Sequence, residues 1–449
     1  MSSKLTEGPI LKVLTKLALP IMASAFLSTA YSLTDMAWIG MLGSKAVAGV
    51  GVGGMYTWLS SGLALLARMG GQVHVGQALG RGDREEAKIY AKTSILLSVI
   101  LGVLFGLLCV AFVNPLVGFF RLDDPDAIRD AKMYIQIVCG LVVFTFVSIV
   151  LTGLYTSQGD SKTPLKANFV GLILNMILDP LLILGVGPFP RLEVIGAAVA
   201  TVFAQVVVTI VMIGMLFTKH TRGNIIREIS FKGIPTKNYF DRVIRLGGPS
   251  ALQSMLYCMF SMVLSRMVSA FGHGPVAVQR VGGQIESLSW NTADGFASAI
   301  NAFTAQNYGA DKMERVKKGY RISAMIMLAW GGLITALFLI FPRQISEIFF
   351  HEADVMKQSV DYLRIIGVSE AFMCVEIMAI GAISGMGNTK LCSAISIVLT
   401  GLRIPLAFVL SKTPLALNGI WWALTISSVA KGIVLNGAFY RECGKHRND

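Results

Sequence analysis

Residues 93–113 read TSILLSVILGVLFGLLCVAFV, a run without a single charged residue. The hydrocarbon core of a bilayer is about 30 Å thick, and a helix needs roughly 20 apolar residues to cross it. The run therefore predicts a transmembrane helix. Eleven further runs that are mostly apolar predict an all-α integral membrane protein with twelve transmembrane helices. The predicted spans are residues 14–38, 47–78, 93–113, 132–156, 165–186, 194–217, 247–270, 276–306, 322–341, 361–385, 391–410 and 417–439.

The composition excludes an ordinary soluble enzyme. Of the 449 residues, 54% are hydrophobic and only 14% are charged, against about 25% charged in a typical soluble protein. The sequence has no phosphate-binding loop, zinc-protease helix or nucleophile elbow. Its six cysteines have neither disulfide nor zinc spacing. We therefore expect no enzyme and no bound cofactor, and an ion gradient or a partner subunit would have to supply the energy for any transport.

The net charge of +13 would suggest nucleic-acid binding in a soluble chain, but the positions of the charges point elsewhere. When alternate loops are assigned to opposite sides of a membrane, one side carries 25 of the 39 lysines and arginines and the other carries 8. Cytoplasmic loops are enriched in these residues. We therefore expect a protein of the cytoplasmic membrane with both termini cytoplasmic, in contact with lipid and without a nucleic-acid partner. The polar start of the chain predicts no cleavable signal peptide.

The sequence repeats its landmarks at an offset near 229 residues. GLYTSQGDSK at residues 153–162 matches GAISGMGNTK at residues 381–390, and Pro20 matches Pro249. These matches lie in loops and at prolines, where apolar composition does not force them, so an internal repeat is the favoured interpretation.

The repeat predicts three parts. They are a six-helix N-lobe at residues 1–217, a basic cytoplasmic linker at residues 218–245 and a six-helix C-lobe at residues 246–449. Because each half has an even number of spans, both lobes enter the membrane in the same orientation. We expect a pseudo-two-fold axis along the membrane normal to relate them, with a cleft between them.

Two acidic residues of the first half form the strongest candidate site, because an ionisable residue inside a membrane costs several kcal/mol, roughly 3 on insertion scales. Asn175 and Asp179 are four residues apart and share a helix face, and Asp35 lies at similar depth late in the first span. With the hydroxyl of Thr201 these oxygens suit Na⁺, and two close carboxylates would equally share a proton. Pro180 frees a backbone carbonyl and favours a bend beside Asp179.

The charged residues of the second half are more scattered. They allow two interpretations, structural ion pairs with intramembrane arginines or the wall of a polar cavity. The acids are Glu286, Asp294, Glu370 and Glu376, and the arginines considered as partners include Arg68, Arg280 and Arg403.

Methionine and aromatic side chains inside the spans would suit an adaptable binding pocket, because flexible surfaces of this kind accept varied ligands. Core packing is the alternative for each of them. The candidates are Tyr31, Met176, Met255 and Tyr257.

The motifs resemble those of the multidrug and toxic compound extrusion (MATE) family, and more closely its DinF-type branch than its NorM-type branch. The resemblance covers nearly the whole chain and is most specific in the loops and in the fifth span. The matching segments are LALP at residues 17–20, TDMAWIG at 34–40, QALGRGD at 77–83, GLYTSQGDSKTP at 153–164, LNMILDP at 174–180 and GAAVAT at 196–201.

This resemblance implies a secondary antiporter that exports organic, often cationic and amphipathic, compounds in exchange for H⁺ or Na⁺ by alternating access. Pro20 would be the hinge of the first helix. The NorM-type branch has a further site in the C-lobe, but Tyr257 stands near the position of its seventh-helix glutamate. Glu376 lies about one residue from its tenth-helix acid. The residues that match the N-lobe cation site are Asp35, Asn175, Asp179 and Thr201.

Two alternatives stay open within transport. One is a lipid-linked saccharide flippase of the same superfamily, for which Arg68, Arg280 and Arg403 would supply a cationic cavity. The other is a transporter of metabolites. For either function we expect a small organic substrate and a monomeric chain.

Overall fold

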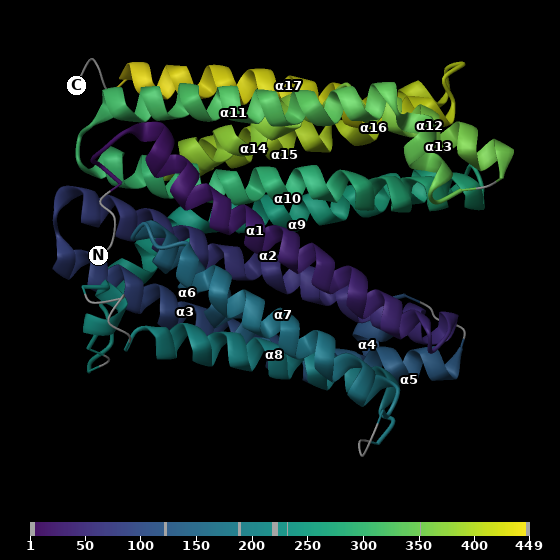
Figure 1. Cartoon of the computed structure of the whole chain (residues 1–449), viewed down its shortest axis with the longest axis horizontal. Coiled ribbons are helices and arrows are strands. Elements are labelled where there is room, and N and C mark those ends of the chain that lie inside the picture. The colour runs from purple at the N-terminus through teal and green to yellow at the C-terminus, as the bar shows by residue number, and fades with distance from the viewer. Residues whose placement is uncertain are drawn as a thin grey trace. The chain divides into compact units, whose positions relative to one another are not determined.

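The computed structural model consists almost entirely of helices (Figure 1). It describes residues 5–120, 124–186, 190–217, 223–230, 232–350 and 352–445, without the side chains of Leu33, Ser44, Ala48 and His273. No β-strand occurs within these ranges, in agreement with the predicted all-α fold class. The first five residues of the predicted linker, and Phe231 within it, lie outside the described residues.

The chain divides into two compact units. The first unit contains Leu5 and residues 19–251, and the second contains residues 6–18 and the chain from Leu252 onward. The division falls inside helices α1 (Ile10–Gly40) and α9 (Lys237–Ser269), and α9 also covers the last part of the predicted linker. Each division point lies close to an internal proline, Pro20 or Pro249. Proline removes a helical hydrogen bond, so both helices divide where their backbone is weakest.

The first unit contains the helices predicted for the first lobe. Within it α2 packs against α3, α5 and α6, while α7 packs along α8. After α1, its helices are α2 (Ser44–Arg81), α3 (Arg84–Ala111), α4 (Val113–Gly118), α5 (Pro125–Tyr134), the π-helix η1 (Ile135–Cys139), α6 (Val143–Ser157), α7 (Lys162–Ile183), α8 (Glu193–Met215) and the 3₁₀ helix η3 (Ile225–Glu228).

The second unit is arranged around α14, which packs against α10, α11 and α17 (Figure 1). Together with most of α9, its helices are α10 (His273–Gly309), α11 (Met313–Ile340), α12 (Pro342–Glu347), α13 (Ala353–Gly367), α14 (Glu370–Gly385), α15 (Thr389–Gly401), α16 (Arg403–Ser411) and α17 (Leu417–Lys445).

Most of the predicted spans correspond to helices that are long and apolar enough to cross a membrane. Within the described ranges nine helical stretches meet that criterion, and two bent helix pairs raise the number to 11. The remaining predicted span, residues 276–306, is helical as part of α10, but it carries more polar residues than the criterion allows and is not among these stretches. Two spans predicted as single helices are bent, by 46° between η1 and α6 and by 47° between α13 and α14.

The internal repeat is confirmed in the backbone of the two units. Gly159 follows α6 with φ of 80°, and Gly387 follows α14 with φ of 93°. Gly82 has φ of 82° after α2, and Asp311 has φ of 55° at the equivalent place after α10. A left-handed residue commonly ends a helix. The short helices α4 and α12 and the two bent spans also recur at the same offset.

The start of α5 shows how local sequence sets a helix boundary. The side chain of Asp124 accepts hydrogen bonds from the backbone N–H groups of Asp126 and Ala127 at 2.9 and 3.3 Å. Pro125 follows at the first helical position, where its missing N–H is not needed. The Lys45 ammonium, 2.6 Å from Asp124, holds the pKa of that carboxyl below its usual range. The cap therefore also ties α5 to the start of α2.

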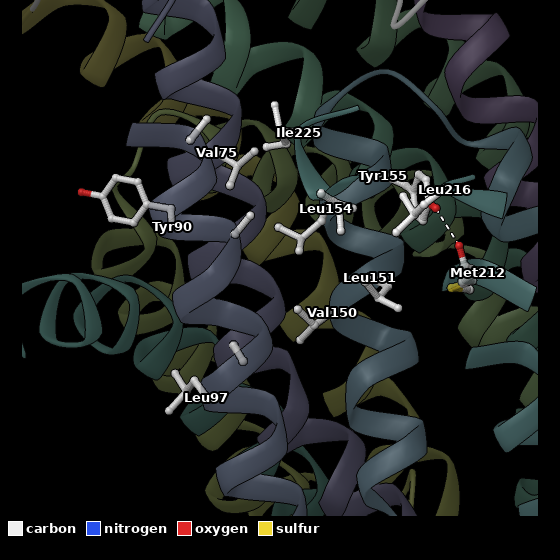
Figure 2. Close-up of a cluster of buried hydrophobic side chains, with 14 of the residues drawn as sticks. Val75, Tyr90, Leu97, Val150, Leu151, Leu154, Tyr155, Met212, Leu216 and Ile225 are labelled. Atoms are coloured by element: carbon white, nitrogen blue, oxygen red, sulfur yellow. Dashed lines mark hydrogen bonds between the residues drawn. The ribbon is translucent and has the colours of Figure 1, made fainter. Parts of the chain in front are cut away.

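A cluster of buried apolar side chains joins α2, α3, α6 and α8 in the first unit (Figure 2). The hydroxyl of Tyr155 on α6 donates a hydrogen bond to the backbone carbonyl of Met212 on α8 at 2.7 Å. Ile225 of η3 belongs to the same cluster, and its N–H donates to Oε1 of Gln158 at 2.9 Å. This segment of the predicted linker is thus anchored to the first unit.

Candidate functional site

The first unit brings the predicted N-lobe site residues onto three neighbouring elements. Tyr31 and Asp35 lie on α1, Asn175 and Asp179 on α7, and Thr201 on α8. The hydroxyl of Tyr31 donates a hydrogen bond to Oγ1 of Thr201 at 3.0 Å. Asp35 and Asp179 interact electrostatically with each other and with Tyr31. The predicted residues therefore form one polar cluster.

Burial makes this cluster costly in the absence of a bound positive charge. Asn175 is 1% exposed and Asp179 is 0% exposed. Both carboxyl oxygens of Asp179, Oδ1 of Asp35 and the amide of Asn175 have no hydrogen-bond partner in the described chain. A buried polar group without a partner costs about 1–3 kcal/mol. These oxygens are acceptors of the cluster that the described protein groups leave unsatisfied.

The chemistry of the cluster suits a light, hard cation rather than a transition metal. In the ranges that the structure describes, no three His, Cys, Asp or Glu side chains gather as a metal site. A sodium ion at Asp35 and Asp179 would take further oxygen ligands from Asn175, Thr201 or the backbone, and carboxylate, amide and hydroxyl oxygens are the ligands that hard cations prefer. A proton shared by the two carboxyls needs no further ligand.

A cavity of about 270 Å³ adjoins this cluster within the first unit. Tyr31 belongs both to the cluster and to the cavity wall, and Arg68 lines the same wall. The stem of Arg68 packs against Gly153, where a Cβ atom would lie 2.9 Å from Cγ of the arginine. Met176 does not line this cavity and is 43% exposed. The polar members of the lining are Ser24, Ser28, Tyr31, Arg68, Thr145, Ser148, Thr152, Asn168 and Gln205.

Both predicted hinge prolines lie inside continuous helices. Pro20 is internal to α1 and Pro180 is internal to α7, directly after Asp179. Neither helix is interrupted at its proline. The bent spans occur instead near Gly140 and Gly367.

The second unit gathers several predicted residues around a cavity of about 240 Å³. Tyr257, Glu286, Glu376 and Arg403 all line it. The other predicted residues of this half are not part of the wall. They are Met255, Arg280, Asp294 and Glu370. The sequence allowed either structural ion pairs or the wall of a polar cavity. Glu286, Glu376 and Arg403 lie in the wall of this cavity.

Lys431 on α17 is a cavity residue that sequence reasoning missed. Its Nζ lies 2.6 Å from Oε1 of Glu376, and the two side chains are only 5% and 7% exposed. Glu376 thus forms its ion pair with Lys431, and no ion pair joins it to an arginine among the described residues. The signal was a lone lysine in the apolar run of residues 417–439.

The other charged groups of the cavity have polar rather than ionic partners. Arg403 donates from Nε to Ser427 at 3.1 Å and from Nη2 to Ser428 at 2.9 Å. Oε2 of Glu286 accepts a hydrogen bond from the hydroxyl of Tyr362 at 3.3 Å. Glu370, at the start of α14, does not line this cavity and is fully buried.

Comparison with known proteins explains the repeat. The MatE family model matches the chain twice, at residues 20–181 and at residues 249–409. The two matches cover more than half of the chain and begin at the two repeat-related prolines.

Curated relatives match almost end to end. A protein of Shewanella oneidensis named FAD transporter is 26% identical over 98% of this chain and 96% of its own length. A Thermotoga maritima protein named probable multidrug resistance protein NorM is 27% identical over 92% of this chain and 88% of its own. These names do not test the expected DinF-type branch, which stays a prediction.

A solved structure supports the fold. A MATE protein crystallised in complex with MaD3S superimposes with a TM-score of 0.92, at 23% identity and with 99% of each chain covered. At this level of identity the likeness shows the fold and nothing of the ligand.

Proposed function

The chain belongs to the MatE family of membrane transporters, and from that premise we propose that it is a cation-coupled antiporter that exports organic compounds. The observation that carries the proposal is the pair Asp35 and Asp179, a half-buried and a buried carboxyl in one polar cluster. Among the described residues, Oδ1 of Asp35 and both carboxyl oxygens of Asp179 have no hydrogen-bond partner. The coupling ion is H⁺ or Na⁺, and no cofactor takes part.

Coupling requires that the ion and the substrate prefer different states of the transporter. A ligand shifts a conformational equilibrium only by its difference in affinity for the two states. A proton or Na⁺ at Asp35 and Asp179 removes the cost of burying their charge, so it favours the arrangement in which the cluster is closed. Antiport requires that the state which holds the ion tightly holds the substrate weakly, and because binding free energies are reciprocal, the substrate weakens ion binding by the same factor. In our proposal this exchange drives alternating access, with Pro20 and Pro180 as hinges.

The names of the relatives support the proposed substrate class. Relatives named for multidrug resistance and for FAD favour organic molecules over the lipid-linked saccharide alternative. We propose that the protein acts as a monomer in the cytoplasmic membrane with both termini cytoplasmic. The excess of lysine and arginine on one set of loops supports that orientation.

The direct test measures accumulation of a fluorescent dye in cells that lack their own efflux pumps. We expect Asp35→Asn and Asp179→Asn each to raise accumulation to the level of cells without the transporter, because an amide cannot exchange the coupling ion. Asp241→Asn is the matched control, since Asp241 is a surface aspartate of the same unit that pairs with Arg245. Equal amounts of folded protein are checked by size-exclusion chromatography. Unchanged efflux in both site variants would show that the ion site is wrong.

Proteoliposomes identify the ion. Substrate uptake is measured with an imposed pH gradient and, separately, with an imposed Na⁺ gradient. Stimulation by only one gradient names the coupling ion, and stimulation by neither contradicts ion coupling.

A further inference from the structure

The charged groups of the second-unit cavity are arranged in one ion pair and two separated charges. Glu376 and Lys431 neutralise each other at 2.6 Å. Arg403 and Glu286 line the same cavity, but no ion pair of 4.0 Å or less joins them or joins either of them to another described residue. The cavity wall therefore presents one cation and one carboxyl group whose charges are not directly paired.

The fixed contacts leave both groups positioned for a ligand. Two serine hydroxyls hold the guanidinium of Arg403, and its Cζ lies 5.9 Å from the centre of the Tyr257 ring. Arg403 as a whole is only 6% exposed. Glu286 is held by the Tyr362 hydroxyl. Glu286 is half-buried and interacts electrostatically with Arg403, but the two groups are too far apart for an ion pair. A ligand with one charge of each sign would give each group a direct partner of opposite sign.

We infer that this cavity binds an aromatic zwitterion, with the carboxylate of the ligand at Arg403 and its ammonium at Glu286. The four charged side chains of the wall are two acids and two bases, so a ligand of zero net charge leaves the site balanced. A purely cationic ligand leaves Arg403 without a counter-charge, and a purely anionic one does the same to Glu286. Tyr257, Trp290 and Tyr362 supply aromatic faces for the ring of the ligand.

The inference narrows the substrate expected from sequence, where a cationic compound was favoured. It rests on the proposed function only in taking the bound molecule to be an exported one, because binding itself requires no transport. Dye efflux that depends on Asp35 while the cavity shows no charge preference would defeat this inference and leave the proposed function standing.

The test is equilibrium binding to the purified full-length chain in detergent. Three probes share one indole ring and differ in charge: tryptophan is zwitterionic, tryptamine is cationic and indole-3-propionate is anionic. We expect the wild type to bind tryptophan roughly tenfold more tightly than either singly charged probe, since each missing charge leaves Arg403 or Glu286 without a direct partner in the ligand.

Two neutralising substitutions should each remove one half of the preference. In Arg403→Gln the affinity for tryptophan falls roughly tenfold, to that for tryptamine, while tryptamine binds as in the wild type. In Glu286→Gln tryptophan instead falls to the level of indole-3-propionate. Arg364→Gln is the matched control, because Arg364 is an exposed arginine of the same unit outside the cavity lining.

This crossed pattern separates recognition from structure. A merely structural role for Arg403 would weaken all three probes together, and that outcome would overturn the inference. Binding of tryptophan to the wild type that is undetectable, or no tighter than binding of the singly charged probes, would overturn it as well.

Discussion

Replacing Lys431 by methionine should lower the stability of the second unit strongly, because it removes one partner of a buried ion pair. Methionine keeps the length and apolar stem of lysine but leaves Glu376 without its counter-charge. At the observed Nζ–Oε1 distance of 2.6 Å, Coulomb attraction is about 6 kcal/mol at an effective dielectric constant of about 20. Desolvation of both groups offsets part of this, and breaking a buried pair typically costs about 3–5 kcal/mol.

The assay is thermal unfolding of the purified protein in detergent without substrate. For a unit of about 200 residues, each kcal/mol lowers the melting temperature by roughly 2–4 °C, so Lys431→Met should lower it by roughly 10 °C. The control is Lys317→Met. Lys317 also pairs with a glutamate in the second unit, but Glu314 is 79% exposed, and surface pairs contribute about 0–1 kcal/mol.

A double variant distinguishes the lost pair from lost packing. Adding Glu376→Gln to Lys431→Met removes the orphaned carboxylate, and neutral replacements of buried pairs are often nearly neutral in stability. The double variant should therefore recover most of the melting temperature, with a coupling free energy above about 1 kcal/mol. A double variant no more stable than Lys431→Met, or a Lys431→Met protein as stable as the Lys317→Met control, would refute the reasoning.

Two further predictions concern packing and capping. Gly381→Ala should cost about 1–3 kcal/mol, because its Cβ would lie 2.4 Å from the carbonyl oxygen of Ala297. Gly332→Ala, which meets nothing within 4 Å, should not destabilise the protein, and equal melting temperatures would contradict the prediction. Asp124→Asn keeps an oxygen acceptor for the cap of α5 but loses the charge that pairs with Lys45. Since the pKa of Asp124 is lowered in the folded protein, the wild type should be more stable than the variant above pH 4, the ordinary range of an aspartate. That advantage should vanish as the pH falls through the lowered pKa, and a difference independent of pH would contradict it.

The parts of the fold that sequence predicted are those encoded locally. Apolar runs located the spans, and the repeat was readable because turns impose backbone constraints on single residues. Gly159 and Gly387 both have positive φ, a conformation that glycine adopts without strain. The bends at the middle of two spans were not predicted, because hydropathy averages over a window. The clues were Gly140 after a π-helical turn and Gly367 at the end of α13, both of them breaks in a helical pattern.

In the candidate sites, too, sequence predicted the local relations between residues and missed the contacts between residues far apart in the chain. Asn175 and Asp179 could be paired from sequence because helical periodicity puts residues four apart on one face. Sequence reasoning and the resemblance both placed Thr201 in the site, but the hydrogen bond from Tyr31 to Thr201 joins residues 170 positions apart, and no local rule predicts it. Lys431 and Glu376 are 55 positions apart on different helices. No local rule links them, and one lysine hardly changes the mean hydropathy of its span.

The repeat duplicates backbone geometry without duplicating charge, and there is a physical reason for this. A turn glycine or a close helix contact is required in both units, because each must close the same turns and pack the same helices. A buried charge is required only where its own partner exists.

At the offset of 229 residues, Leu264 stands in place of Asp35, and Val202 stands in place of Lys431. Each charge could therefore be gained or lost in one unit without disturbing the other. The first unit groups two acids with hydroxyl and amide side chains, which suits a small cation. The second holds acids balanced by a lysine and an arginine, which suits a ligand with charges of both signs. The antiport that we propose needs two ligands recognised by different chemistry, and a duplicated scaffold with diverged charges would meet that need.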